Sequence, residues 1–153
     1  MMMLRIVLSV FFGFCAISSA QAANLFSGLN LKGQGEWRDS NGMKGTFDST
    51  MAVARDKVVS TYAIKVPGAG VVETFATDYG MVLKAGESFA VTSNGSEIGT
   101  GYCVDQLICH YQANFYGIAL EETMVRTSAK TVRRFGSKVL PNGVTVTWDE
   151  ILK

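Results

Sequence analysis

Hydrophobic and polar positions alternate along most of the chain from Gly33 onward, with a period of two residues. This period is typical of β-strands that bury one face. In residues 46–54, for example, Phe47, Met51 and Val53 share one face. Almost no segment shows the 3.6-residue period of an amphipathic helix, so the pattern predicts an all-β protein.

Clusters of glycine, asparagine and proline divide this pattern into about ten or eleven predicted strands. The dividing segments include residues 40–45, residues 67–70 and the Asn94–Gly95 pair, a sequence typical of tight hairpin turns. Connections of about two to six residues indicate an antiparallel meander. Because an open sheet of so many strands would leave exposed edges, we expect closure into a small up-and-down barrel. A two-sheet β-sandwich is the alternative, which the pattern separates poorly from a barrel.

The N-terminus differs from the rest of the chain. Residues 6–17 form an apolar segment that follows the positive charge of Arg5 and precedes small residues ending at Ala22. This arrangement predicts a signal peptide over residues 1–22 with cleavage after Ala22, which leaves a single all-β domain over 23–153. The segment is shorter than the roughly 20 residues of a membrane-spanning helix. We therefore expect a periplasmic or secreted protein without stable membrane insertion after cleavage; an uncleaved anchor is the alternative.

Charge narrows the range of partners. Cleavage removes Arg5 from the 14 basic residues and none of the 13 acidic ones, so the mature chain has 13 of each. A formal charge of zero argues against nucleic acid as a partner, since phosphate binding depends on a basic surplus. The longest runs of like charge, Glu121–Glu122 and Arg133–Arg134, give little support for a role at a membrane surface. We expect residues 23–31 to be loosely ordered.

Two cysteines remain after cleavage, Cys103 and Cys109. Strands predicted over residues 98–104 and 107–115, with a turn between them, place these cysteines opposite each other. An even number of cysteines in an oxidising compartment favours a disulfide, which would fix the register of this hairpin. Five residues separate the cysteines, unlike the two of a catalytic redox pair, and a closed zinc site would need one more ligand beside His110. We expect a structural disulfide, no metal and no cofactor.

The single histidine, His110, does not belong to a recognisable catalytic set. We expect it to pair with Tyr102 across the hairpin, half exposed. Nucleophilic catalysis would need a nearby Ser or Cys with an orienting acid, and the chain contains no Gly-x-Ser-x-Gly motif. Glu121 and Glu122 are adjacent on a predicted strand and point to opposite faces, so they cannot act together on one substrate. The sequence predicts no enzyme.

Several charged and aromatic residues fall on faces that are predicted to point inward. Glu73 shares a face with Phe75, while Glu122 and Arg126 share one on a later strand. Buried charges need partners, and a ligand is one way to supply them. We predict that Arg126 binds a carboxylate or other anionic group of a ligand. The predicted ligand-binding residues are Tyr62, Glu73, Phe75, Phe89, Tyr111, Glu122 and Arg126.

Two functions fit this interior, depending on how much of it is filled. An open interior predicts an exported barrel that binds a small hydrophobic or amphipathic ligand, which is the function we expect. Small barrels are also commonly filled by their own side chains, with charges at the rim. The alternative is therefore a periplasmic interaction or inhibitor module that contacts an envelope protein through loops such as residues 40–45 and 67–70.

The segment Gly35–Glu36–Trp37 resembles the Gly-x-Trp signature that opens lipocalins and related calycin barrels. The resemblance implies a lipocalin-like barrel in which Trp37 packs across the closed end. In this superfamily a late-strand arginine often covers the tryptophan, and Arg133 or Arg134 matches that arginine by position. The resemblance is limited to this strand and to the architecture, since no second or third lipocalin motif is visible. Without it, Trp37 is simply an anchor of the core.

Overall fold

Ten antiparallel strands make up the part of the chain that the computed structural model describes, residues 26–105 and 107–153. The strands are β1 (Asn30–Asp39), β2 (Lys44–Ala54), β3 (Lys57–Val66), β4 (Gly70–Leu83), β5 (Ser88–Ser93), β6 (Ser96–Val104), β7 (Ile108–Phe115), β8 (Ile118–Ser128), β9 (Thr131–Val139) and β10 (Thr145–Leu152). Each pairs with its neighbours in sequence, and β1 pairs with β10. The predicted up-and-down barrel is confirmed, and the two-sheet sandwich is excluded. The predicted signal peptide lies outside the described residues.

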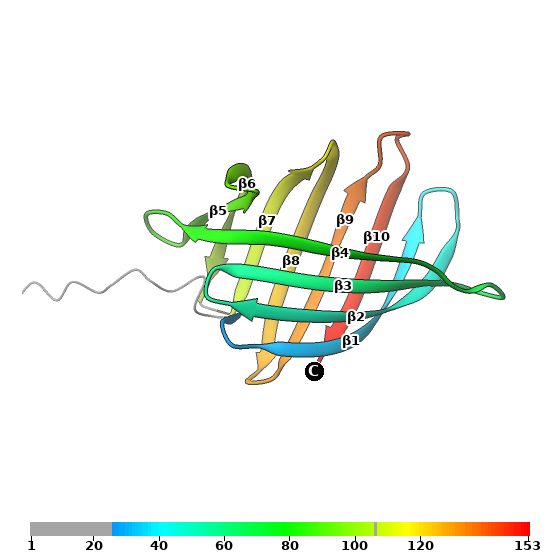
Figure 1. The fold of residues 1–153 in the computed structure, drawn as a ribbon, viewed down its shortest axis with the longest axis horizontal. Coiled ribbons are helices and arrows are strands. Elements are labelled where there is room, and N and C mark those ends of the chain that lie inside the picture. Colours follow the sequence, from blue (N-terminus) through cyan, green and yellow to red (C-terminus); the bar gives the residue numbers. More distant parts are fainter. Residues whose placement is uncertain (1–25, 106) are drawn as a thin grey trace, which may run out of the picture.

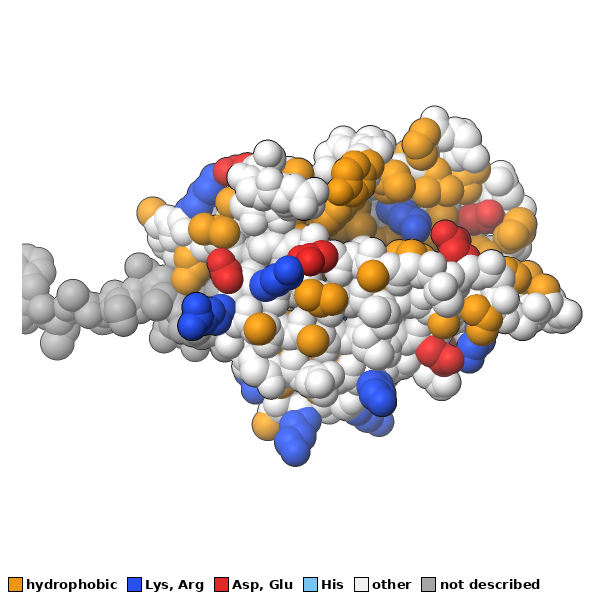
Figure 2. Space-filling model, viewed as in Figure 1, with side chains coloured by type: hydrophobic (Ala, Val, Ile, Leu, Met, Phe, Trp, Pro, Cys, Tyr) orange, Lys and Arg blue, Asp and Glu red, His pale blue; other side chains and the backbone are white. Residues whose placement is uncertain are grey.

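The barrel is splayed at one end. Strands β1–β4 run across the front, and β7–β10 cross behind them at a steep angle (Figure 1). Strand β5 pairs with only the last four residues of β4, Gly80–Leu83. Within the described chain, residues 70–79 of β4 therefore pair with β3 alone. Figure 2 shows a hollow above β4 with hydrophobic side chains inside it.

The opposite end of the barrel is closed by a hydrophobic core. It lies where β1, β3 and β9 begin and where β2, β4 and β10 end. Members that are at most 1% exposed include Met51, Val58, Val91, Val132 and Leu152. Among the described residues, none belongs to a helix long and apolar enough to cross a membrane.

The segment before β1 also contributes to this core. Phe26 and Leu31 are 2% and 4% exposed, and the backbone of Gly28 donates a hydrogen bond to the carbonyl of Val53 at 2.8 Å. The expectation of loose order is therefore wrong for residues 26–31, because their apolar side chains cover the closed end of the barrel. Residues 23–25 lie outside the described chain.

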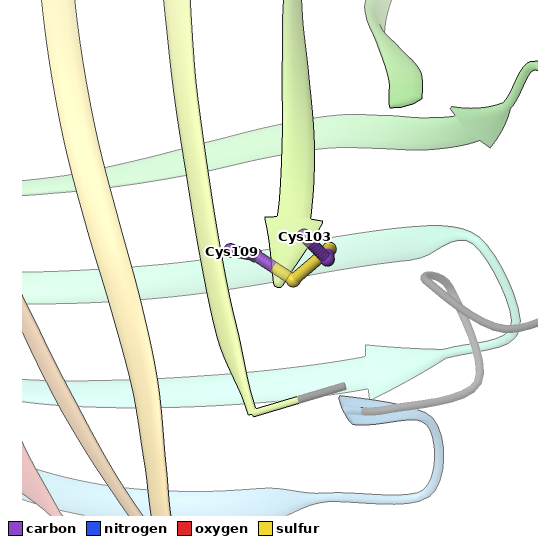
Figure 3. Close-up of a disulfide and its surroundings, with 2 residues drawn as sticks. All are labelled: Cys103 and Cys109. Carbon is purple, nitrogen blue, oxygen red and sulfur yellow. A yellow bond between two sulfur atoms is a disulfide. The ribbon is translucent and has the colours of Figure 1, made fainter. Parts of the chain in front are cut away.

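The β6–β7 hairpin has the predicted register. Cys103 lies directly opposite Cys109, and their sulfur atoms are 2.08 Å apart, at disulfide distance (Figure 3). Both side chains are buried in the core at the closed end. His110 pairs with Tyr102, as predicted, and its imidazole is partly buried. The cysteine pair thus fixes a hairpin whose inner face belongs to the core.

Two hairpin turns at the splayed end share a left-handed backbone. Asn94 and Gly95 have φ values of 50° and 78°, the turn geometry that this residue pair predicts. Tyr116 and Gly117 adopt the same conformation, with φ values of 53° and 86°. Tyr116 is 87% exposed. Asparagine tolerates a positive φ, whereas a bulky aromatic residue is strained there.

Candidate ligand-binding cavity

The splayed end opens into a cavity of about 760 Å³. The segment of β4 that lacks a β5 partner forms one lip, and the β5–β6 and β7–β8 turns form the other. The aromatic side chains of the wall are Tyr62, Phe75, Tyr79, Tyr111, Phe115 and Tyr116. The interior is thus filled at the closed end and open at the splayed end, so neither an empty barrel nor a fully filled one describes it.

One part of the cavity wall is a stack of aromatic rings from neighbouring strands. Tyr62 and Phe75 are cross-strand partners whose rings stack with centroids 4.8 Å apart. Phe47 lies against the other side of Tyr62 at 6.0 Å. Burial raises the pKa of Tyr62 to about 12, so its hydroxyl stays protonated at neutral pH. This wall offers flat apolar surface to a ligand.

The floor of the cavity is polar. Tyr111 donates a hydrogen bond to Oε1 of Glu122 at 2.9 Å, and its hydroxyl oxygen lies 3.1 Å from that of Tyr79. Because Tyr111 gives its proton to Glu122, we assign Tyr79 as the donor in the second contact. Burial raises the pKa of both tyrosines. The three groups form a chain of hydrogen bonds across the floor.

Glu122 is the carboxyl group at the end of this chain, and its side chain is only 3% exposed. Burial raises its pKa above the ordinary value of 4.5. The charge of Arg134 and the hydrogen bond from Tyr111 act in the opposite direction but do not cancel the effect of burial. The folded protein therefore favours the protonated acid more than water does.

A second buried acid, Glu150, lies with Arg134 behind the floor. Arg134 Nε donates to Glu150 Oε1 at 2.5 Å and lies 3.8 Å from Glu122 Oε2. Arg134 Nη1 donates to the hydroxyl of Ser60 at 2.9 Å, and Ser49 donates to Glu150 Oε2. The shorter contact makes Glu150 the principal partner of the guanidinium. One base therefore serves two acids.

The guanidinium of Arg134 lies against the ring of Tyr62, a residue of the cavity wall. Its Cζ lies 5.2 Å from the ring centroid of Tyr62, and Arg134 is fully buried. Burial alone would lower the pKa of Arg134, but interactions with Tyr62, Glu122 and Glu150 raise it, so the group is charged. Its Nη2 atom has no hydrogen-bond partner among the described residues.

Lys138 and Glu73 lie in the cavity wall towards the open rim. Lys138 Nζ lies 5.4 Å from the ring centroid of Phe75. Burial lowers the pKa of Lys138, and the nearby charge of Glu73 acts in the opposite direction. Glu73 itself is exposed. These charges belong to the mouth of the cavity, whereas Glu122 belongs to its floor.

Most of the predicted ligand-binding residues meet in this cavity, but two do not. Phe89 is fully buried in the core, with its ring 6.4 Å from that of Tyr111. Arg126 donates to the carbonyl oxygens of Ser128 and Ala129 in the β8–β9 turn, at the closed end. The structure does not bring Arg126 to the cavity, since it lies four positions beyond Glu122 along β8, towards the closed end. Those that line the cavity are Tyr62, Glu73, Phe75, Tyr111 and Glu122.

Sequence reasoning missed Glu150 as a charged group of the interior, and it gave Arg134 only a role beside Trp37 at the end of the barrel. Glu150 alternates with the inward residues Trp148 and Leu152, and this pattern was a usable signal. Arg134 follows the buried Val132 at the same spacing. The alternation that identified Glu122 would also have predicted that Glu150 and Arg134 point inward.

The fold resembles that of a known protein. The S-type phycobiliprotein lyase CPES from Guillardia theta matches with a TM-score of 0.64, covering 85% of this chain and 88% of that chain. At the level of the fold, the match supports a lipocalin-like barrel for this chain. The sequence identity is 8%, so the likeness concerns the fold alone. A redesigned β-barrel matches with a TM-score of 0.38 and 11% identity, covering 87% of this chain and 95% of that chain. No family model and no curated protein matches this chain.

Trp37 occupies a different place from the one that the Gly-x-Trp resemblance implied. In this lipocalin-like barrel it pairs with Trp148 and Gly45, which lie towards the splayed end, and Trp37 Nε1 donates to the carbonyl of Lys65 at 3.4 Å. Arg133 lies over Phe135, and Arg134 over Tyr62. The ring contacts of both arginines are therefore with residues other than Trp37.

The outer surface of the barrel carries the remaining candidate chemistry. His110 Nδ1 lies 3.0 Å from Thr123 Oγ1, and His110 Nε2 lies 3.5 Å from Glu121 Oε1. Glu121 points outward and Glu122 inward, as predicted. A depression of about 840 Å³ is lined by Glu121, Arg133 and other exposed or half-buried residues. Within residues 26–105 and 107–153, no group of three His, Cys, Asp or Glu side chains is placed to hold a metal ion.

Proposed function

We propose that the protein binds a small amphipathic molecule, which enters through the splayed end and lies above Glu122. The observation that carries this proposal is the combination of an aromatic wall and a buried polar floor in one cavity of about 760 Å³. Small-molecule sites are commonly of this size, mostly apolar, with a few placed polar groups. The apolar part of the ligand would contact Tyr62 and Phe75, and its polar end would reach Glu122.

The proposed role is binding and not catalysis. Glu122 is the carboxyl group on the cavity floor, while Glu150 is held behind it by Arg134 and Ser49. The two acids therefore share a counterion and do not flank a common reaction centre. The likeness to a lyase concerns the fold, and no lyase chemistry is transferred from it.

We also propose that the protein acts in the periplasm or outside the cell. The signal peptide predicted over residues 1–22 supports this location. The placement of Cys103 and Cys109 at disulfide distance supports it too, since disulfides persist mainly in oxidising compartments.

Native mass spectrometry of the mature protein, purified without detergent from its own host, tests the binding proposal. We expect an additional mass that is lost on denaturation, with the protein mass reduced by two hydrogens for the disulfide. Leu120 lines the cavity, so Leu120→Trp should fill it and abolish the additional mass. The neighbouring Ala119 is exposed, so Ala119→Trp serves as the matched control and should retain it. A bare mass for the wild-type protein would instead favour the interaction module with no ligand.

A further inference from the structure

The charged groups that line the cavity are mostly acidic. They comprise four carboxyl groups and two ammonium groups: Asp56, Glu73, Asp78, Glu122, Lys57 and Lys138. Lys57 and Asp78 neutralise each other in an exposed ion pair of 2.8 Å. Near the rim, the positive charge of Lys138 interacts with the negative charge of Glu73. The carboxyl group on the cavity floor, Glu122, thus receives no ion pair from the basic side chains of the cavity wall.

The base behind the floor does not compensate Glu122 fully. Arg134 Nε is 2.5 Å from Glu150 but 3.8 Å from Glu122, and the guanidinium lies against the ring of Tyr62, a residue of the cavity wall. One positive charge therefore faces two buried acids. Arg134 is not among the residues of the cavity wall, so an anionic ligand group would meet Glu122 before it met this arginine.

The other groups around Glu122 leave this imbalance in place. They are Tyr111 from β7, Tyr79 from β4, Tyr62 from β3, and Trp148 and Glu150 from β10. The tyrosines are neutral, since burial raises the pKa of each. A cation bound at Glu122 would balance the charges of the interior: the carboxylates of Glu122 and Glu150 against Arg134 and the ligand. Aromatic faces would stabilise the cation further.

We infer that the cavity selects amphipathic ligands whose buried end is a cation, such as an ammonium group on an apolar body, held by the carboxylate of Glu122. This inference rests on the proposed function and specifies its ligand class. It reverses the sequence-based expectation of an anionic ligand held by Arg126. Binding would replace the proton of Glu122 with the ligand's charge, and the affinity should therefore rise with pH through the pKa of this carboxyl.

Three probes with the same chain and different heads test the inference. Calorimetric titration of the mature, disulfide-bonded protein measures selectivity at neutral pH, with dodecylammonium and dodecanoate below their micelle concentrations and dodecanol below its solubility limit. We expect dodecylammonium to bind about tenfold or more tightly than dodecanol, the gain typical of a hydrogen bond to a charged group. Dodecanoate should bind most weakly.

Glu122→Gln tests whether this carboxyl is the origin of the selectivity. Glutamine keeps the size of the side chain and an oxygen that accepts from Tyr111, but it cannot ionise. The affinity ratio of dodecylammonium to dodecanol should fall towards one, and the pH dependence of dodecylammonium binding should disappear. Glu121→Gln, on the adjacent outward position, is the matched control and should keep both.

The outcomes separate the inference from the proposed function. Equal binding of the three probes, or tighter binding of dodecanoate, would overturn the cationic ligand and leave a binding barrel. Failure of all three to bind would overturn the inference, and a bare native mass in addition would overturn the proposed function. Selectivity of the wild-type protein decides the inference even where Glu122→Gln fails to fold.

Discussion

Arg134 and Glu150 form an ion pair inside the barrel, with 2.5 Å between Arg134 Nε and Glu150 Oε1. They are cross-strand partners on β9 and β10, and their side chains are 1% and 0% exposed. On the outer face of the same strands, Arg133 pairs with Asp149, and these side chains are about half exposed. The barrel thus contains two arginine–carboxylate pairs on the same strands, one buried and one in water.

Replacement of Arg134 by methionine should destabilise the protein strongly. The variant Arg134→Met leaves Glu122 and Glu150 buried without a counterion, and loss of one partner of a buried pair typically costs about 3–5 kcal/mol. Urea unfolding followed by tryptophan fluorescence measures the change. Arg133→Met removes the exposed pair and should change the midpoint little, since surface ion pairs contribute little. Equal effects of the two variants would contradict the assignment of Arg134 to the interior.

The pH dependence of stability should report the protonation of Glu122. Its folded-state pKa is raised above 4.5, so the unfolded chain loses this proton first as the pH rises. The contribution of Glu122 is therefore fully present below about pH 4.5 and is lost as the pH rises through the raised pKa. The glutamine in the variant Glu122→Gln cannot ionise. The urea midpoint of this variant should therefore rise relative to that of the wild-type protein as the pH increases across this range.

The lowered pKa values of Asp48 and Asp149 give the opposite trend, since their contributions are lost as the pH falls. Both residues are present in the wild-type protein and in Glu122→Gln. Their effect therefore cancels in the difference between the two curves of urea midpoint against pH. Parallel curves would show that the pKa of Glu122 is not raised.

Tyr116→Asn should stabilise the β7–β8 turn. Tyr116 has a φ of 53°, a conformation that costs most residues about 1–2 kcal/mol and asparagine less. Since the ring is 87% exposed, its loss removes little packing, and we expect a gain of about 1 kcal/mol in urea unfolding. Tyr102→Asn, at an exposed position within β6, is the control and should bring no gain. A loss of stability in Tyr116→Asn would show that the ring, or its contact with Asn94 at 3.3 Å, outweighs the strain.

Removal of the cysteine pair should have a moderate effect. The bridge spans a sequence separation of six residues, and closure of so short a loop is worth about 2 kcal/mol in the chain-entropy model. The double variant Cys103→Ala/Cys109→Ala should therefore lower the free energy of unfolding by about this amount. Reductant should destabilise the wild-type protein and leave the double variant unchanged. A wild-type protein insensitive to reductant would mean that the bridge does not form.

The strand pattern was predictable because it is local. A period of two residues follows from backbone geometry, and pairs such as Asn94–Gly95 mark turns through their own φ preferences. The pairing of Cys103 with Cys109, and of His110 with Tyr102, followed from the turn between two short strands. Closure into a barrel followed from the number of strands and the cost of exposed edges.

The interior was less predictable, because it depends on which strands lie opposite each other. Glu122 was assigned inward correctly from its neighbours on β8, but its relation to Arg134 and Glu150 joins three strands. Arg126 shares a predicted face with Glu122, yet its place near the end of β8 lets it bind the next turn instead. Inward direction is a property of one strand, whereas height along the barrel axis is set by the register of all of them.

The sequence by itself determined the strands, the hairpin turns, the facing cysteines and which side chains of most strands point inward, because each depends on residues close together in the chain. The tertiary structure alone decided that β4 separates from β5 before Gly80, that the cavity opens there, and that Arg134 contacts Tyr62 and two buried acids. These features arise from contacts between strands far apart in sequence.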